Sequence, residues 1–236
     1  MSDTLRERKL FILTLGFEEK FAVRMITRHG LDEGDELLAI TGPRVEKVER
    51  TVVYLHEFIS KYYSGDVRFS VREVNPQEGF SSMVSDIVDI FLEKAKDYDR
   101  IIVNLSGGMR AICLATFMAS LLIAPSLGKK LQVELETEDS SAFVSIPIGL
   151  LNLPRSLSEI RLEETVFHIL QLLAKKEHTA IELAKAIGKD VTTIRRHLIK
   201  LREGGLVVSN GSRPAKYKLT PQGRLVINLI QRREGS

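Results

Sequence analysis

The sequence predicts an α/β domain with a doubly wound, mainly parallel sheet, followed by a small helix-turn-helix module with a wing. Short β-branched strands alternate with amphipathic helices up to about residue 150, and short helices with one hairpin follow. Charge changes at the same place. Residues 155–236 carry 16 Lys and Arg against 8 Asp and Glu, a net +8, whereas residues 1–154 carry 18 against 23, a net −5. The C-terminal part is therefore expected to bind nucleic acid.

Composition and hydropathy indicate an ordinary soluble protein. Its 236 residues are 44% apolar and 28% charged, as in ordinary soluble proteins. The longest nearly apolar run, 111–124, is shorter than the ~20 residues that a membrane span needs. The N-terminal apolar run stops at Leu15 without a small-residue cleavage site. We therefore expect a cytoplasmic protein without membrane association, in which the single cysteine, Cys113, packs within an apolar helix.

Strand and helix patterns alternate through the first part. The predicted strands cover residues 9–15, 35–41, 67–74, a run from Ile101, 131–137 and 143–148. The predicted helices cover 18–29, 44–63, 81–96 and a segment that begins near Met109. The last two strands are expected to form a hairpin around residues 138–141. Repeated β-α-β units with right-handed crossovers give a doubly wound sheet.

The stretch 101–119, IIVNLSGGMRAICLATFMA, combines a strand, a glycine turn and a helix. The run Ile101 to Val103 is typical of a strand buried on both faces, and Ser106, Gly107 and Gly108 follow it. The next segment has no breaker before Pro125 and predicts a buried helix. The free N–H groups of its first turn form a site for an anion. Arg110 is poorly placed for the helix dipole but well placed for a phosphate.

The winding of the sheet predicts where a ligand binds. In the common strand order 3-2-1-4-5, the first and fourth strands are neighbours, and ligands bind at their carboxyl ends. Those ends are 14–17 and 104–110, two glycine turns that would face each other across one crevice. The first strand lacks a G-x-G-x-x-G after it and the second does not end in an acidic residue, which disfavours a dinucleotide dehydrogenase. The absence of G-x-x-x-x-G-K-[ST] excludes a P-loop enzyme.

Residues 1–150 are predicted as the ligand-binding and dimerisation domain, 151–158 as a linker and 159–236 as the DNA-binding domain. Helices are expected at 162–174, at 179–187 with Thr179 as N-cap, and after an Asp190 cap up to 203. Segments 206–209 and 216–219 flank Asn210-Gly211 as a hairpin, and Pro221 starts a last helix.

The helix after Asp190 has the pattern of a recognition helix. Ile194, Leu198 and Leu201 share its core stripe, and basic residues lie away from that stripe. Such a helix enters the major groove of double-stranded DNA while the wing reaches phosphates or the minor groove. The expected DNA-binding residues are Thr192, Thr193, Arg195, Arg196, Lys200, Arg213 and Lys216.

Motifs in both parts resemble known families. Residues 179–219 resemble the winged helix-turn-helix domains of prokaryotic repressors, particularly in TIRRHL at 193–198 and EGGLV at 203–207. The TLGF turn at 14–17 and NLSGGMR at 104–110 resemble the CRISPR-associated Rossmann fold, the CARF domain. In this order, the two parts resemble the CARF-winged-helix transcription regulators of archaeal CRISPR systems.

This resemblance implies a ligand-responsive transcription regulator in antiviral defence that is not an enzyme and needs no cofactor or metal. It further implies a homodimer whose two CARF domains bind a cyclic oligoadenylate, with cyclic tetra-adenylate as the expected ring, across the two-fold axis. The expected ligand-binding residues are Thr14, Leu15, Gly16, Phe17, Asn104, Ser106, Gly107, Gly108, Met109 and Arg110.

The alternative function is a ring nuclease that cleaves the bound oligoadenylate. Neither motif contains a general base, so a nuclease would act by positioning and charge stabilisation alone. Arg24 and His29 have the R-x4-H spacing of nuclease domains that accompany many CARF proteins, but the looser spacing recurs elsewhere in the chain and indicates chance. His197 lies near the core stripe and is expected to be structural or to contact a phosphate.

Overall fold

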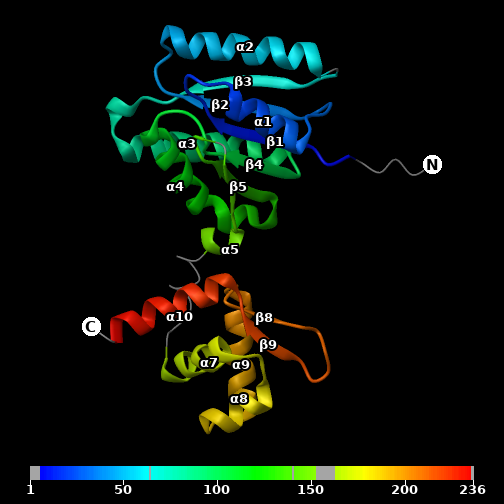
Figure 1. The fold of residues 1–236 in the computed structure, drawn as a ribbon, viewed down its shortest axis with the longest axis vertical. Helices are drawn as coiled ribbons and strands as arrows, with labels where there is room; N and C mark the ends of the chain where they lie inside the picture. Colours follow the sequence, from blue (N-terminus) through cyan, green and yellow to red (C-terminus); the bar gives the residue numbers. More distant parts are fainter. Residues whose placement is uncertain (1–5, 64, 140, 153–162, 235–236) are drawn as a thin grey trace, which may run out of the picture. The chain divides into compact units, whose positions relative to one another are not determined.

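The computed structural model describes residues 6–63, 65–139, 141–152 and 163–234. The chain divides into two compact units, Met1–Ile148 and Gly149–Ser236 (Figure 1). Most of the linker predicted at 151–158, from residue 153 onward, and the start of the helix predicted at 162 lie outside the described residues.

The first unit is a sheet with helices on both faces. Its strand order is β3-β2-β1-β4-β5-β6, which confirms the predicted order 3-2-1-4-5 and adds β6 at the edge. The pairs from β3 to β5 are parallel, and β6 is antiparallel to β5, as the predicted hairpin requires. The strands are β1 (Lys9–Thr14), β2 (Glu36–Thr41), β3 (Arg68–Glu73), β4 (Arg100–Asn104), β5 (Leu131–Glu136) and β6 (Phe143–Ile146).

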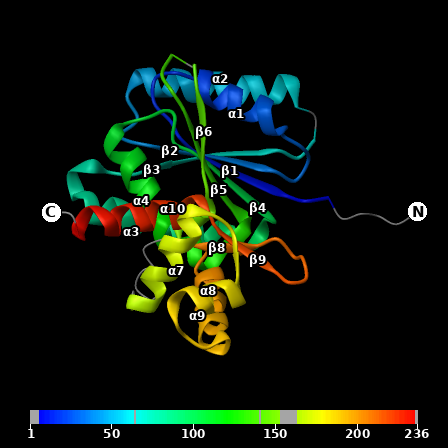
Figure 2. The ribbon, with the colours of Figure 1, turned by 60° about the horizontal axis from the view of Figure 1, so that its bottom comes forward.

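The helices form two layers, seen from two sides in Figures 1 and 2. On one face, α1 and α2 bury Met25, Ile26 and Leu55 against Phe11 and Leu37 of the sheet. On the other face, α3 and α4 pack against each other. The main helices of this unit are α1 (Lys20–His29), α2 (Glu46–Tyr62), α3 (Phe80–Lys94) and α4 (Arg110–Leu127). The short helix α5 (Ile148–Leu151) follows, although the sequence predicted that a strand would continue to residue 148.

Helix α4 differs from its prediction in two respects. Pro125 lies inside it, and the helix continues to Leu127, because a proline so near the C-terminus removes only one hydrogen bond from the last turn. The helix is also buried on one side only, since Leu114, Met118 and Leu122 are 61%, 40% and 60% exposed. Within the described part of the chain, α4 alone is long and apolar enough to cross a membrane, although its inner side packs as a helix of the folded domain.

The second unit is a helix-turn-helix with a wing, as predicted. A core cluster that includes Ile169, Leu183, Leu198 and Val226 joins its four main helices. The strand order is β7-β9-β8, and the sequence missed β7 because that strand is only two residues long. The helices are α7 (Glu164–Lys175), α8 (Ala180–Ile187), α9 (Val191–Glu203) and α10 (Pro221–Glu234), and the strands are β7 (His178–Thr179), β8 (Val207–Ser209) and β9 (Lys216–Leu219).

Both predicted helix caps of this unit are confirmed. The Thr179 hydroxyl accepts the Glu182 N–H at 3.2 Å, and the Glu182 carboxylate accepts the Thr179 N–H at 2.7 Å, which completes a capping box. The Asp190 carboxylate accepts the Thr193 N–H at 2.8 Å at the start of α9. These caps fix where α8 and α9 begin.

Candidate ligand crevice and nucleic-acid surface

The glycine turns after β1 and β4 lie in direct contact, which confirms their predicted juxtaposition. A Cβ atom on Gly16 would lie 2.9 Å from the Gly108 Cα, and one on Gly107 would lie 2.9 Å from the Thr14 carbonyl oxygen. Gly108 also has a φ of +86°, which side chains disfavour. Only glycine allows the two backbones to approach this closely.

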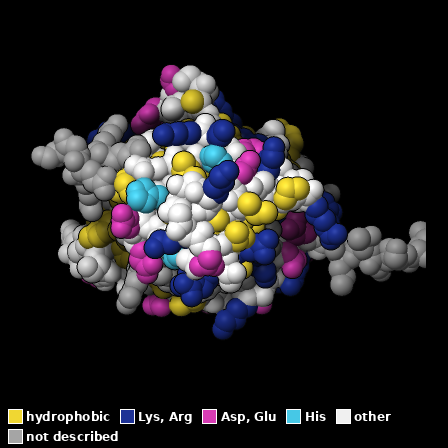
Figure 3. Space-filling model, turned by 90° about the horizontal axis from the view of Figure 1, so that it is seen from below, with side chains coloured by type: hydrophobic (Ala, Val, Ile, Leu, Met, Phe, Trp, Pro, Cys, Tyr) yellow, Lys and Arg dark blue, Asp and Glu magenta, His cyan; other side chains and the backbone are white. Residues whose placement is uncertain are grey.

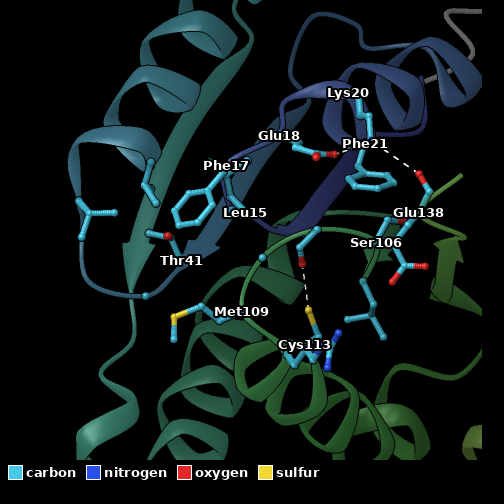
Figure 4. Close-up of a pocket in the computed structure, with 18 of the residues that line it drawn as sticks. Leu15, Phe17, Glu18, Lys20, Phe21, Thr41, Ser106, Met109, Cys113 and Glu138 are labelled. Atoms are coloured by element: carbon cyan, nitrogen blue, oxygen red, sulfur yellow. Dashed lines mark hydrogen bonds and ion pairs between the residues drawn. The ribbon is translucent and has the colours of Figure 1, made fainter. Parts of the chain in front are cut away.

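These turns line a cavity of about 910 Å³ at the carboxyl ends of the strands (Figure 4). The cavity is lined mainly by apolar groups, and Phe17 is one of its most exposed side chains. Eight of the residues expected to bind ligand line it: Leu15, Gly16, Phe17, Ser106, Gly107, Gly108, Met109 and Arg110. The place of the cavity agrees with the position predicted from the winding of the sheet.

Thr14 and Asn104 do not line the cavity, which corrects their assignment as direct ligand contacts. Both are 2% exposed. The Thr14 hydroxyl donates to the Gly107 carbonyl at 2.5 Å, and the Asn104 side chain accepts the Ser106 N–H at 3.0 Å. Their polar atoms therefore hold the Ser-Gly-Gly turn in shape from below.

The start of α4 presents free hydrogen-bond donors. For the backbone N–H groups of residues 107–112, no acceptor is found among the described residues. The Ser106 N–H does not add to these donors, because it is already bonded to the Asn104 side chain. Arg110 is exposed at the cavity, and no described residue forms an ion pair with it. The donors that remain can meet an anion, as at other helix N-termini.

A buried charge network lies beside this turn. The Glu134 carboxylate, fully buried on β5, accepts hydrogen bonds from Asn104 at 3.1 Å and Arg28 at 3.1 Å and lies 2.8 Å from His29. Burial alone would raise the pKa of Glu134, but these partners, His29 first, bring the pKa below its ordinary value. Arg24 pairs with Glu136 of the same strand. The R-x4-H pair thus joins a network that supports the sheet and the turn.

Cys113 has a role beyond the packing predicted for it. The thiol donates to the Gly107 carbonyl at 2.9 Å, and the side chain lines the cavity. Burial raises the pKa of this thiol. A neutral thiol is therefore one more group that fixes the glycine turn.

Sequence reasoning missed the polar rim of the cavity. Lys20 forms an ion pair with Glu18 at 2.6 Å and reaches the Glu138 carbonyl at 3.5 Å, in the turn between β5 and β6. Lys47 does not line the cavity itself, but its ammonium lies 5.5 Å from the centre of the Phe17 ring. Glu18 and Lys20 directly follow the TLGF turn, so their nearness in sequence was an available signal. For Lys47 and Glu138 the sequence holds no such signal.

The recognition helix α9 exposes Thr192, Arg195, Arg196 and Lys200, as predicted. None of these three basic side chains forms an ion pair with a described residue. Thr193 is half-buried, and its hydroxyl donates to Asp190 at 2.6 Å, so its first role is in the helix cap. Figure 3, a view from below, shows Lys and Arg side chains spread over this face, with Asp, Glu and apolar side chains among them.

The wing is built around one side chain. Asn210 Oδ1 accepts from the Ser212 N–H, the Ser212 hydroxyl and the Lys216 N–H at 3.2, 2.7 and 3.0 Å. The loop is longer than the tight Asn210-Gly211 turn, since Ser209 pairs with Tyr217. Arg213 and Lys216 are exposed on it. The wing thus presents the two predicted cations from an ordered loop.

His197 faces the core of the same unit and is 9% exposed. Burial lowers the pKa of His197 below its ordinary value. The charge of Glu163 raises this pKa, whereas the charges of Arg196 and Lys200 lower it further. The residue is therefore a structural histidine, one of the two roles expected for it.

Comparisons with known proteins agree with this architecture. Residues 9–147 match the Csa3 CRISPR-associated Rossmann-like domain, and residues 163–209 match the bacterial regulatory protein arsR family. A CRISPR locus-related putative DNA-binding protein, Csa3 of Thermoproteus tenax, is 30% identical over 225 residues, which cover 95% of this chain and 98% of that protein.

Solved structures overlap with smaller parts of the chain. A homodimeric winged helix-turn-helix DNA-binding domain from Mycobacterium bovis is 25% identical, covers 35% of this chain and 75% of that one, and has a TM-score of 0.30. The Zalpha domain of Carassius auratus PKZ, solved with Z-DNA, is 28% identical. The match covers 24% of this chain and 94% of that one and has a TM-score of 0.24. By the match over its first domain and over nearly the whole relative, the chain belongs to the Csa3 family of CRISPR-associated proteins and joins a Rossmann-like domain to a winged helix-turn-helix of the arsR regulatory type.

Proposed function

We propose that this CRISPR-associated DNA-binding regulator responds to a cyclic oligoadenylate, which binds in the crevice between the two glycine turns. The observation that carries the proposal is a combination of groups at one cavity: the N–H groups of residues 107–112 and Arg110, all without partners among the described residues, and the exposed ring of Phe17. Phosphates fit the donors, and adenines fit the apolar wall. Cyclic tetra-adenylate is the ring we propose.

The ligand is proposed to bind a two-fold dimer. On α4, Leu114, Met118 and Leu122 continue the stripe that begins with Arg110, at intervals of four residues. A helix that is apolar all round normally has no exposed face, so a second copy of the chain is the occupant we propose for this one. Because the stripe leads to Arg110, pairing α4 with its copy brings two crevices together. An even-membered ring can then share the two-fold axis.

The dimer is testable with one surface change. Leu122→Glu places a charge in the stripe at a side chain that is 60% exposed, so it should disturb an interface between copies more than the fold of one copy. We expect this variant to sediment as a monomer while the parent sediments as a dimer. The control Val53→Glu changes a residue of similar exposure on α2 and should remain dimeric. A monomeric parent would contradict the proposal.

DNA is proposed to bind through α9 and the wing. Arg195, Arg196 and Lys200 have the exposure and the free charge that contacts with base edges and phosphates require. A binding ring can alter DNA affinity only if it favours one arrangement of the two winged helices over another. Ligand and DNA must then change each other's affinity by the same factor, typically about 5- to 150-fold.

The experiment uses the full chain and a DNA site selected from a random library. DNA affinity is measured with and without cyclic tetra-adenylate, and ligand affinity with and without the selected DNA. A common factor that differs clearly from 1 supports the proposal, whereas a factor of 1 in both measurements, or no ligand binding at all, would refute it. Incubation with the ring, followed by a search for linear products, tests the ring-nuclease alternative on the same samples.

A further inference from the structure

One buried polar atom at the crevice has no partner among the described residues. Thr41 lies at the carboxyl end of β2 and is 1% exposed, and its hydroxyl oxygen has no hydrogen bond in the described part of the chain. Its backbone carbonyl does have a partner, because it accepts the Val74 N–H at 2.8 Å. Native proteins rarely leave a buried hydroxyl unbonded, since its desolvation is then uncompensated.

The orphan hydroxyl belongs to the cavity wall. Thr41 lines the same cavity as Phe17, and Figure 4 shows the two drawn on one side of it. The neighbouring wall is apolar and consists of Phe17, Pro43, Val45, Val48 and Met109. Arg110 and the free N–H groups of α4 supply donors for a phosphate elsewhere in the cavity, and Lys47, whose ammonium lies 5.5 Å from the centre of the Phe17 ring, does not line the cavity. The wall beside Thr41 therefore offers a phosphate no lining cation.

A nucleobase has the matching shape and chemistry. Its faces are apolar, its edge carries donors and acceptors, and a threonine hydroxyl can serve as either partner. Pockets that bind such groups combine an apolar wall with very few polar atoms that set orientation. We infer that the Thr41 hydroxyl is the specificity-determining contact for an adenine edge of the ligand, an inference that rests on the proposed function.

Met109 is the side chain through which the base would reach Thr41. Its sulfur lies so close to Gly42 that a Cβ there would be 2.6 Å away, and the side chain is 48% exposed. Methionine is unbranched and adapts readily to new neighbours. An entering base that displaces the Met109 side chain would open the cavity wall at Gly42, directly after Thr41.

The test compares two buried orphan hydroxyls. Thr41→Val removes the hydroxyl at the cavity, whereas Thr116→Val removes one that is equally unpartnered among the described residues from within α4, at a residue that does not line the cavity. Binding of cyclic tetra-adenylate to the full-length variants is measured by calorimetry. We expect Thr41→Val to weaken binding roughly 5- to 100-fold, because one ring meets two copies of the contact. Thr116→Val should bind like the parent, and Thr41→Ser should bind within a few fold of it.

A second ring separates a contact with the base from one with the ribose. Cyclic tetra-guanylate has bases of similar size with different edges, so the parent should prefer the adenylate ring, and Thr41→Val should narrow that preference. If Thr41→Val bound both rings more weakly by the same factor, the assignment of the contact to the base would be wrong. Unchanged affinity of Thr41→Val for the adenylate ring would overturn the inference and leave the proposed function intact. Failure of the parent to bind that ring would refute the proposed function itself. If Thr41→Val does not fold, Thr41→Ala, which also lacks the hydroxyl, takes its place and should narrow the ring preference in the same way.

Discussion

The crevice and the recognition surface both suit anions but are built in opposite ways. The crevice is concave and uses glycines, backbone N–H groups and one arginine, with the glycine turn held by partly buried hydrogen bonds. The surface of α9 and the wing is exposed and uses long cationic side chains without ion-pair partners among the described residues. Backbone donors cannot adjust, whereas long side chains can. We therefore expect small substitutions in the crevice to cause large losses of ligand affinity, and single substitutions on the α9 surface to cause smaller losses of DNA affinity.

The largest effect is expected from a single methyl group in the crevice. Gly108→Ala places a Cβ 3.2 Å from Leu15 N and forces a residue with a side chain to a φ of +86°. We expect ligand binding to fall by about two orders of magnitude or more. The control Gly79→Ala imposes a φ of +93° where nothing lies within 4 Å, so it carries the backbone strain without the contact. Equal ligand affinity of the two variants in calorimetry would contradict this account of the turn.

Removal of the crevice cation should have the next largest effect. Arg110→Ala is expected to weaken binding of cyclic tetra-adenylate about 10- to 150-fold, the value of a charge-assisted hydrogen bond. DNA binding without ligand should stay within a few fold of the parent, but the effect of ligand on DNA should be lost. Arg72→Ala, an exposed arginine on β3, serves as the control. Tight ring binding by Arg110→Ala would show that the crevice is the wrong site.

Much of this architecture was predictable from local signals. The buried apolar runs, the glycine turns and the helix caps act through neighbouring residues, so the strand order and both caps were predicted correctly. The winding rule then brought residues 14–17 and 104–110 to one crevice. The winged helix followed from one apolar stripe, a cap and a hairpin.

What the sequence missed depends on contacts between distant segments. Thr14 and Asn104 lie in the right motifs, but whether their polar atoms face ligand or support the turn is decided by Gly107 and Glu134. The orphan hydroxyl of Thr41 is visible only once the whole wall is assembled. The exposed stripe of α4 was hidden because an apolar segment looks the same in sequence whether it meets a core or a second copy.

Base reading by α9 should show an intermediate effect. If Arg196 contacts a base edge, Arg196→Ala should cost ~1–3 kcal/mol at the selected DNA site and much less on random DNA. Arg224→Ala, an exposed residue of α10, should leave both affinities unchanged. Equal losses on specific and random DNA, measured by fluorescence anisotropy, would show that Arg196 contacts only the DNA backbone.

A phosphate contact from the wing should show a smaller, salt-dependent effect. Lys216→Ala should weaken binding to all sequences alike and reduce the slope of log affinity against log salt by about 1. The measurement is a salt titration of DNA affinity for parent and variant. An unchanged slope would remove Lys216 from the interface and leave the wing without one of its two predicted cations.

The smallest effect distinguishes the two units by their response to acid. The pKa of His197 is lowered from 6.5 by burial, so the unfolded chain binds its proton more readily, and the second unit should lose stability as pH falls below about 6.5. The pKa of Glu134 is lowered from 4.5, so its contribution to the first unit persists above about 4.5 and is lost only below that pH. Hydrogen exchange should therefore show that α9 opens more readily at pH 5.5 than at pH 7.5, whereas the opening of β4 is the same at both. The His197→Leu variant should lose this pH dependence in α9. Equal acceleration in both units would contradict this assignment.

The stoichiometry of ligand binding tests the central claim most directly. Calorimetric titration of the full-length parent with cyclic tetra-adenylate should give one ring for two chains, because a shared crevice on the two-fold axis is what joins the ligand to the dimer. No binding, or one ring for each chain, would contradict the account.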